Sequence, residues 1–293
     1  MALVSIIIPT FNRAGKVARA ISSVLYQTFT DYEIIVVNDA SSDGTERVLS
    51  QFGKHITCLN HSTNLGVSAA RNTGIRGACS PFIAFLDSDD YWLPQKLAGQ
   101  IGFFSSHPKA VACQTEEIWI RNGRRVNPKK KHMKISGDIF EASLKLCLVS
   151  PSAVMLKRAL LEEAGLFDED LPACEDYDLW LRIACRYPVQ LIRQQLVVKE
   201  GGKVDQLSIR HKGMDRFRIK ALVKLIRSGK LNEQQLEATL KEVSFKCNLY
   251  GKGCIKRGKL DEGAFYLRIP ERLTGKPSKA VSGGRDGKGP YSF

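Results

Sequence analysis

The sequence predicts an α/β protein built on a mainly parallel, Rossmann-like β-sheet flanked by helices. In the first ninety residues, short apolar runs alternate with segments of helical periodicity. The apolar runs are continuous, as in strands that are covered on both faces. The connecting segments have the length of right-handed βαβ crossovers. No GxGxxG motif follows the first run, so a dinucleotide-binding Rossmann domain is not expected despite the similar layering.

Each strand of this first part is predicted from one apolar run. The runs are VSIII (4–8), EIIVVND (33–39), HITCLN (55–60) and FIAFLD (82–87). After the first strand we expect a helix with Asn12 as its N-cap and with Val17, Ile21, Val24 and Leu25 on one face. A short helix within SSDGTERVLSQF follows the second strand, and a helix rich in small residues (65–75) follows the third.

Beyond residue 93 the pattern changes to mixed strands and helices. We expect a helix over 94–104, a strand over 110–120, an extended segment that becomes helical near Arg158, a helix over 175–187 and a last strand over 190–202. From about residue 212 the sequence is basic and has helical periodicity. We therefore predict a main domain over 1–211, a small C-terminal helical appendage over 212–274, and a disordered Gly-, Ser- and Lys-rich tail over 275–293.

Composition limits the function classes. The chain has 293 residues, 43% of them hydrophobic, and no apolar run of the roughly 20 residues needed to span a bilayer. The opening MALVSIIIPT is typical of a strand rather than a signal peptide, and the eight scattered cysteines indicate reduced thiols in the cytoplasm. The net charge of +14 indicates an anionic partner such as nucleic acid, an anionic membrane surface or a phosphorylated small molecule.

The densest basic block is RNGRRVNPKKKHMK (121–134). It has no interleaved aromatic residues that could stack on bases, and no nucleic-acid-binding signature occurs elsewhere, so no nucleic-acid partner is expected. A solvated hairpin turn or loop is an equally open interpretation of this block.

Polar groups follow three of the predicted strands. The strand ends carry PTFN (9–12), NDASSDG (38–44) and DSDD (87–90). Ligands of open parallel sheets bind beyond the carboxyl ends of the strands, so these groups are expected at one crevice. Asp87, Asp89 and Asp90 repel one another unless something positive lies among them. The cluster therefore suggests a cation site.

Five segments together resemble the nucleotide-sugar glycosyltransferases of family 2, which have a GT-A fold. The segments are VSIIIPTFNR, EIIVVNDASSDGT, LGVSAARNTGI, FIAFLDSDD and GLFDEDLPACEDYDLWLR. The resemblance covers roughly residues 3–211. It implies transfer of a sugar from a nucleoside-diphosphate donor, most simply a UDP-sugar, with inversion at the anomeric carbon.

The resemblance assigns the donor side of the site residue by residue. Asp87 and Asp89 match the DxD pair, with Asp89 as ligand of a divalent metal, Mg²⁺ or Mn²⁺, and Asp87 nearer the ribose and diphosphate. Asp39 matches the acid that contacts the nucleobase, and Arg71 matches an arginine near the nucleotide. Thr10, followed by Phe11, resembles the rim of the nucleoside pocket. The alternatives are a strand-to-helix turn capped by Asp90, turn residues at positions 10, 11 and 39, and a surface arginine.

The resemblance also places the acceptor side. Glu175 and Asp176 match an ED pair whose second acid removes the proton of the acceptor hydroxyl, although Asp176 could serve instead as a first-turn acid of its helix. His211 matches a further metal ligand. Tyr177 and Trp180 could line the acceptor site or belong to the core.

The sequence thus predicts a metal-dependent inverting glycosyltransferase that acts on a saccharide or lipid-linked acceptor. We expect it in the cytoplasm with peripheral contact at the inner face of an anionic membrane. Two alternatives stay open, namely a nucleotidyltransferase that makes a sugar nucleotide and a non-catalytic nucleic-acid-binding protein. A nucleotidyltransferase would usually carry a glycine-rich basic loop where this chain has PTFNRAG.

Overall fold

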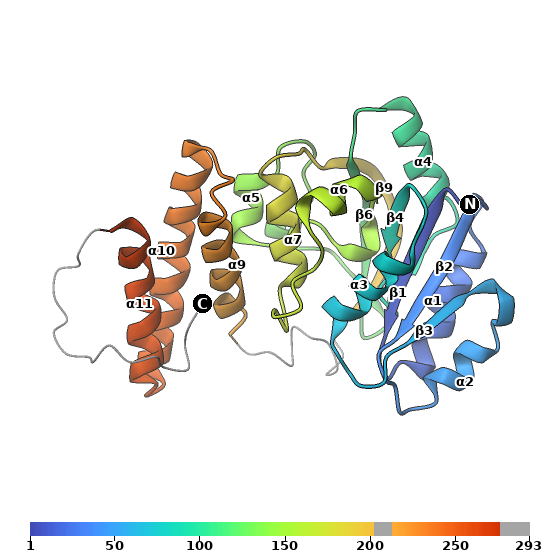
Figure 1. The fold of residues 1–293 in the computed structure, drawn as a ribbon, viewed down its shortest axis with the longest axis horizontal. Helices are drawn as coiled ribbons and strands as arrows, with labels where there is room; N and C mark the ends of the chain where they lie inside the picture. The colour runs from blue at the N-terminus through green and yellow to red at the C-terminus, as the bar shows by residue number, and fades with distance from the viewer. Residues whose placement is uncertain (202–212, 276–293) are drawn as a thin grey trace.

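The computed structural model describes residues 1–201 and 213–275, and this part of the chain forms a mixed sheet with helices on both faces (Figure 1). The strands lie in the order β3-β2-β1-β4-β8-β6-β9-β5, and β7 pairs with β6. Their bounds are β1 Val4–Thr10, β2 Tyr32–Asn38, β3 Thr57–Asn60, β4 Phe82–Phe85, β5 Tyr91–Trp92, β6 Ala112–Arg121, β7 Arg124–Val126, β8 Val154–Lys157 and β9 Gln190–Gly201.

The helices follow the strands in the expected alternation. Their bounds are α1 Ala14–Leu25, α2 Thr45–Ser50, α3 Val67–Gly77, α4 Lys96–Ser106, α5 Phe140–Lys145, α6 Arg158–Ala164, α7 Glu175–Ala184, α9 Asp215–Arg227, α10 Glu233–Lys256 and α11 Leu260–Thr274. Short 3₁₀ turns lie at Gly53–His55, Lys130–His132 and Pro151–Ala153.

Strand β1 shows how the sheet separates two cores. Ile6 and Ile8 pack into a cluster with α1 and α4, while Ile7 packs into a second cluster with α3 and α7. Successive side chains of a strand point to opposite faces, so a continuous apolar run supplies both clusters. The prediction of a sheet covered on both faces is confirmed.

The pairing of the first four strands is parallel, as predicted. Strand β1 pairs in parallel with β2 and β4, and β2 pairs in parallel with β3. The register places Thr10 opposite Asn38, and Asn38 opposite Asn60, so the carboxyl ends of three strands are aligned. The later strand β8 pairs antiparallel with both β4 and β6, which makes the whole sheet mixed.

The N-terminus of α1 differs from its prediction. Asn12 is not the N-cap; it has a left-handed backbone (φ 51°), and its side-chain oxygen accepts a hydrogen bond from the Ser42 amide at 2.8 Å. Asp43 instead accepts from the amide of Ala14 at 3.1 Å, and Thr45 from that of Arg13 at 3.0 Å. The cap therefore comes from the next βα unit, which local spacing could not reveal.

The basic block of residues 121–134 is structured at its start. Asn122 and Gly123 both have positive φ, 49° and 75°, and form the two-residue turn of the β6–β7 hairpin. An Asn-Gly pair favours this turn because both positions require the left-handed region. The hairpin interpretation of the block is thereby confirmed for its first residues, whereas helix α5 and strand β5 were not predicted.

The C-terminal helices stack beyond α7 and α5, with α9 packed on α7, α10 on α5 and α9, and α11 on α10 (Figure 1). Phe217, Ile219 and Leu222 of α9 join the cluster that contains the buried side of α7. Helices α10 and α11 approach closely at Gly251 and Gly263, because a Cβ on Gly251 would lie 3.0 Å from the Gly263 carbonyl oxygen. The domain boundaries remain predictions, and the predicted tail lies, apart from its first residue, outside the described residues.

Within residues 1–201 and 213–275, no helix combines the length and the apolar character needed to cross a bilayer.

The contact of α3 with β1 gives a test of this packing. A Cβ added to Gly74 would overlap the Cγ2 atom of Ile7, whose side chain is fully buried. We expect Gly74→Ala to lower the free energy of unfolding by about 1–3 kcal/mol. The control is Gly102→Ala on α4, where a Cβ meets no atom within 4 Å; it should raise that free energy by about 0.5–1 kcal/mol. Chemical denaturation measures both, and equal effects at the two sites would contradict the close helix–sheet packing.

Candidate active site

A cavity of about 740 Å³ lies beyond the carboxyl ends of β1, β2 and β4. The structure brings six of the predicted site residues to its wall, namely Thr10, Asp39, Arg71, Asp87, Asp89 and Asp176. The predicted neighbours Phe11 and Glu175 also line it. His211 lies outside the described residues, so its predicted metal-ligand role stays a prediction.

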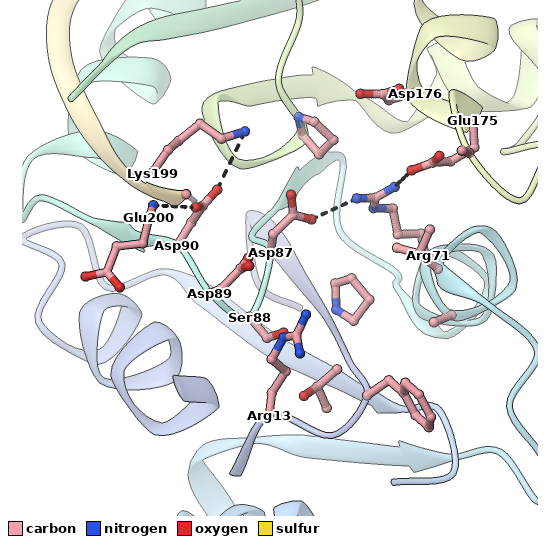
Figure 2. Close-up of a pocket in the computed structure, with 18 of the residues that line it drawn as sticks. Arg13, Arg71, Asp87, Ser88, Asp89, Asp90, Glu175, Asp176, Lys199 and Glu200 are labelled. Carbon is pink, nitrogen blue, oxygen red and sulfur yellow. Dashed lines mark hydrogen bonds and ion pairs between the residues drawn. The ribbon is translucent and has the colours of Figure 1, made fainter. Parts of the chain in front are cut away.

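Arg71 joins two walls of the cavity (Figure 2). Its guanidinium donates to Asp87 at 2.8 Å and to Glu175 at 2.7 Å. The arginine is 3% exposed, and although burial disfavours its charge, the two carboxylates raise its pKa. Asp87 follows β4 and Glu175 begins α7, so this one side chain ties together segments that are far apart in the sequence.

The three aspartates after β4 occupy different surroundings. Burial opposes ionisation of Asp87, but Arg71 and Lys199 outweigh it and hold the pKa of Asp87 below its usual value. The pKa of Asp89 is raised by burial and by repulsion from Asp87. Asp90 is 2% exposed, and burial raises its pKa to about 8 against the effect of Lys199. Nearby cations therefore compensate the charge of Asp87, whereas the charge of Asp89 is not fully compensated.

Asp90 anchors the strand that closes the cavity. Its carboxylate accepts hydrogen bonds from Ser152 Oγ at 2.7 Å and from the Glu200 amide at 3.2 Å. Lys199 Nζ lies 3.8 Å from the same carboxylate (Figure 2). It also donates to Ser150 Oγ at 2.8 Å. These contacts support the structural role that the sequence left to Asp90.

Lys199 is a site residue that the sequence did not indicate. It lies on β9, lines the cavity, and has a pKa that burial lowers but that Asp90, Glu117 and Asp87 raise more strongly. Its position in a run of strand residues carries no local signal. What identifies it is the pairing of β9 with β5 and β6, which turns it towards the aspartates.

A buried ion pair contributes to the electrostatic environment of Lys199. Glu117 on β6 lies 3.1 Å from Lys134 Nζ and accepts a hydrogen bond from the Trp119 indole at 3.0 Å. Burial would raise the pKa of Glu117, but Lys134 and Lys199 lower it to about 2. Lys134 belongs to the basic block, so part of that block is buried structure rather than a solvated loop.

Thr10 and Asp39 lie on the wall formed by the ends of β1 and β2. The Thr10 hydroxyl is buried at this wall and has no hydrogen-bond partner among the described residues. Such an unsatisfied polar atom at a cavity is the kind of group that a polar ligand would satisfy. This observation favours the site prediction over a simple turn.

Asp39 is already saturated with hydrogen bonds. One carboxylate oxygen accepts from His61 Nδ1 at 2.7 Å and from the Leu65 amide at 2.8 Å. The other accepts from Asn64 at 2.9 Å and from the Gly66 amide at 2.8 Å. A carboxylate offers about four acceptor sites, so Asp39 fixes the segment that leads into α3. Contact with a nucleobase stays a prediction.

Glu175 and Asp176 open α7, where the helix dipole favours negative charge. Cys174 before them has a left-handed backbone (φ 65°), which turns the chain sharply at the cavity wall. Asp176 is half-buried and accepts a hydrogen bond from the Tyr177 amide at 2.7 Å. It projects from a different wall than Asp89, with Asp87 between them (Figure 2).

The two aromatic residues of α7 belong to the core. Tyr177 and Trp180 are each 1% exposed. The Tyr177 hydroxyl donates to the Leu144 carbonyl at 2.5 Å. The core interpretation of these two side chains is therefore the correct one.

The carboxylates at the end of β4 suit a hard divalent cation. Such ions prefer oxygen ligands, and Mg²⁺ in particular uses one or two carboxylates together with substrate phosphates and waters. The raised pKa of Asp89 indicates a carboxylate that lacks enough positive charge nearby. No group of three or more His, Cys, Asp or Glu side chains in the described part of the chain forms a metal cluster. The residues thus fit a metal ion that would be bound jointly by these aspartates and by the phosphates of a ligand.

The sequence of residues 5–165 matches the family described as Glycosyl transferase family 2. Among curated relatives, an uncharacterized glycosyltransferase (RP339) of Rickettsia prowazekii is 35% identical over 185 residues, which is 61% of this chain and 58% of that protein. The UDP-Glc:alpha-D-GlcNAc-diphosphoundecaprenol beta-1,3-glucosyltransferase WfgD of Escherichia coli is 37% identical over 182 residues, 62% of this chain and 69% of that one.

Solved structures show the same fold. TarS residues 1–349 from S. aureus align with a TM-score of 0.69 and 18% identity over 94% of this chain and 83% of that one. The mannosyltransferase PcManGT from Pyrobaculum calidifontis, in complex with GDP-Man and Mn²⁺, aligns with a TM-score of 0.60 and 17% identity over 93% and 85% of the two chains. The predicted GT-A architecture is confirmed.

The Arg71 contacts predict a pH-dependent stability change. In Arg71→Met, the buried Glu175 would lose its counter-charge, which typically costs 3–5 kcal/mol, so we expect a loss of about that size at pH 7. The pKa of Glu175, which burial already raises, would then rise further above that of the unfolded chain, while Asp87 would keep Lys199 nearby. The folded variant would bind more protons, and its deficit should shrink as the pH falls from 7 to 5.

Denaturant unfolding at the two pH values measures this effect. The matched control is Arg76→Met on the same helix, where an exposed ion pair with Glu169 should contribute less than about 1 kcal/mol. If Arg71→Met loses the same free energy of unfolding at pH 5 and at pH 7, the explanation by an unpaired buried carboxylate is contradicted.

The Glu117–Lys134 pair predicts a second pH effect. The pKa of Glu117 is about 2 in the folded protein and 4.5 in its ordinary state. Its contribution, on the order of 3 kcal/mol, is therefore present above pH 4.5 and lost as the pH falls towards 2. We expect Glu117→Gln to be less stable at pH 7 and to show a shallower loss between pH 5 and pH 2.5. Glu162→Gln, with an exposed carboxylate, should keep the wild-type slope.

Proposed function

The chain belongs to glycosyltransferase family 2, and we propose that it transfers one sugar from a UDP-sugar to a hydroxyl group of a lipid-linked saccharide, with inversion at the anomeric carbon. The observation that carries the proposal is the shared cavity, because the aspartates after β4 and the acids that open α7 face the same space. The bond that breaks joins the anomeric carbon to the diphosphate, and the bond that forms joins that carbon to the acceptor oxygen.

The donor nucleotide would bind along the ends of β1, β2 and β4. The unsatisfied Thr10 hydroxyl offers a polar group to the nucleoside. Asp39 holds the segment before α3, and α3 carries Arg71, so the nucleotide wall and the arginine are built as one unit. Arg71 in turn holds Asp87 with one oxygen committed to the guanidinium.

Asp87 and Asp89 would hold a divalent cation, Mg²⁺ or Mn²⁺, in the donor complex. When bound, such a cation supplies positive charge to the diphosphate that leaves. Lys199 adds a fixed ammonium at the same side of the cavity, since its pKa is raised and its charge is retained. These residues stabilise the negative charge that develops on the leaving group.

Asp176 would accept the proton of the acceptor hydroxyl. It lies across the cavity from Asp89, so the acceptor oxygen would approach from the face opposite the departing diphosphate (Figure 2). This direction of attack inverts the configuration. Proton transfer late in the reaction requires correct placement of the base more than a high pKa, and Glu175 fixed by Arg71 places the start of α7.

The acceptor side is basic and opens at the β6–β7 hairpin. Trp119, Ile120 and Arg121 of β6 line the cavity, and Arg124 and Arg125 follow in the hairpin. An acceptor with a diphosphate, such as the one named for the E. coli relative, fits this charge. Nucleotidyl transfer and nucleic-acid binding, the two alternatives from the sequence, gain no support from the cavity.

Ligand-dependent unfolding separates donor binding from catalysis. UDP with Mn²⁺ should raise the unfolding midpoint. At a UDP concentration of 100 times the Kd, binding should stabilise the folded protein by about 2.7 kcal/mol. Asp89→Ala should abolish this rise. Asp176→Asn should keep the rise but lower the rate of transfer, or of donor hydrolysis across a panel of sugar nucleotides, by about 10²–10⁴-fold.

Two results would contradict the assignment. Full activity of Asp176→Asn would exclude it as the base, and an undiminished UDP–Mn²⁺ effect in Asp89→Ala would exclude the metal role.

A further inference from the structure

Helix α10 has a buried face and an exposed face of unusual composition. The buried face contacts α9 and α11 and repeats every four residues, through Thr239, Val243, Cys247 and Gly251. The opposite face carries two large apolar side chains: Phe245 is 62% exposed and Leu249 57%. Phe245 and Leu249 lie one helical turn apart and so form one patch. Figure 1 shows α10 at the end of the molecule distant from β2 and β3.

The same face is positively charged. No Asp or Glu occurs between Val243 and Leu260. Lys252 and Lys256 are exposed in this stretch and form no ion pair with a carboxylate of residues 1–201 or 213–275. Lys246 is different, because it is buried and lies 2.9 Å from the Glu242 carboxylate. Two uncompensated cations, three and seven residues after Leu249, therefore lie on the same face as the exposed apolar side chains.

We propose that this face of α10 docks on an anionic membrane surface. We call it the outer stripe and define it by Phe245, Leu249, Lys252 and Lys256. An interfacial helix inserts apolar side chains at the level of the lipid headgroups while its Lys and Arg side chains contact anionic lipids. Each Lys or Arg near such a surface contributes attraction that falls with ionic strength. The outer stripe has both components.

A second copy of the chain is a poorer occupant. A symmetric dimer would place the same surface patch of both subunits face to face. Lys252 and Lys256 of one subunit would then lie close to the same two lysines of the partner. Like charges opposed across an interface cost free energy, whereas anionic headgroups supply the opposite sign.

The location agrees with the proposed function and deepens it. A lipid-linked acceptor is anchored in a membrane, so an enzyme that docks there meets its acceptor at high local concentration. The purpose of the outer stripe rests on that proposed function. Its binding does not, because vesicle binding is measured without any sugar transfer.

Vesicle sedimentation tests the outer stripe with the full chain. Wild-type protein should bind vesicles of phosphatidylglycerol and phosphatidylcholine, bind phosphatidylcholine vesicles weakly, and lose binding as salt rises. Both Phe245→Gln/Leu249→Gln and Lys252→Gln/Lys256→Gln should lower the partition coefficient at least about 10-fold. Their thermal midpoints and donor hydrolysis should match the wild type, since these side chains are exposed and distant from the cavity residues.

Matched controls distinguish the effect of the outer stripe from the effects of net charge and of exposed apolar side chains elsewhere. Lys54→Gln/Lys109→Gln removes two exposed lysines elsewhere, and Tyr26→Gln removes an aromatic that is 77% exposed. Both should keep wild-type binding. The proposal is overturned if the charge control loses as much binding as the stripe variants, or if stripe variants bind like the wild type. It is also overturned if the wild type is a dimer in lipid-free sedimentation and the stripe variants are monomers.

Discussion

The contact of Arg71 with Asp87 and Glu175 is the interaction on which the candidate site depends. The two carboxylates are separated by the whole middle of the chain, and a single buried guanidinium holds them on either side of one cavity. Only an arginine has the planar fork that reaches two carboxylates at once. Through this contact the segment that follows β4 and the start of α7 are bound to the same side chain.

The aspartates around this contact differ in how their charges are compensated. Asp87 is neutralised by Arg71, Asp90 is held by Ser152 and the Glu200 amide, and Asp89 is left with a raised pKa at the cavity. Behind them, the buried pair of Glu117 and Lys134 keeps the surroundings of Lys199 fixed. In the proposed reaction, a site arranged in this way would present the Lys199 ammonium and the cation-binding carboxylate of Asp89 before the diphosphate leaves.

The C-terminal helices serve the fold on one side and face solvent on the other. Helix α9 extends the core against α7, and α10 packs closely on α11 through Gly251 and Gly263. Because one face satisfies the packing, the composition of the opposite face is not needed for folding. Exposed apolar and cationic side chains on that face therefore point to a partner outside the chain, and the charge selects an anionic one.

Much of the fold and of the site could be predicted from the sequence, and the limit has a physical reason. The periods of the apolar residues determined the parallel strands β1 to β4 and the helices between them, because local periodicity reports burial on each face. The motifs located Thr10, Asp39, Arg71, Asp87, Asp89 and Asp176, all of which the structure brings to one cavity. The antiparallel strand β8, the cap of α1 by Asp43 and Thr45, and the saturation of Asp39 depended on contacts between segments distant in sequence. Lys199 and Glu117 likewise carry no local signal. Periodicity records whether a side chain is buried, but only the tertiary structure decides which charges share that burial.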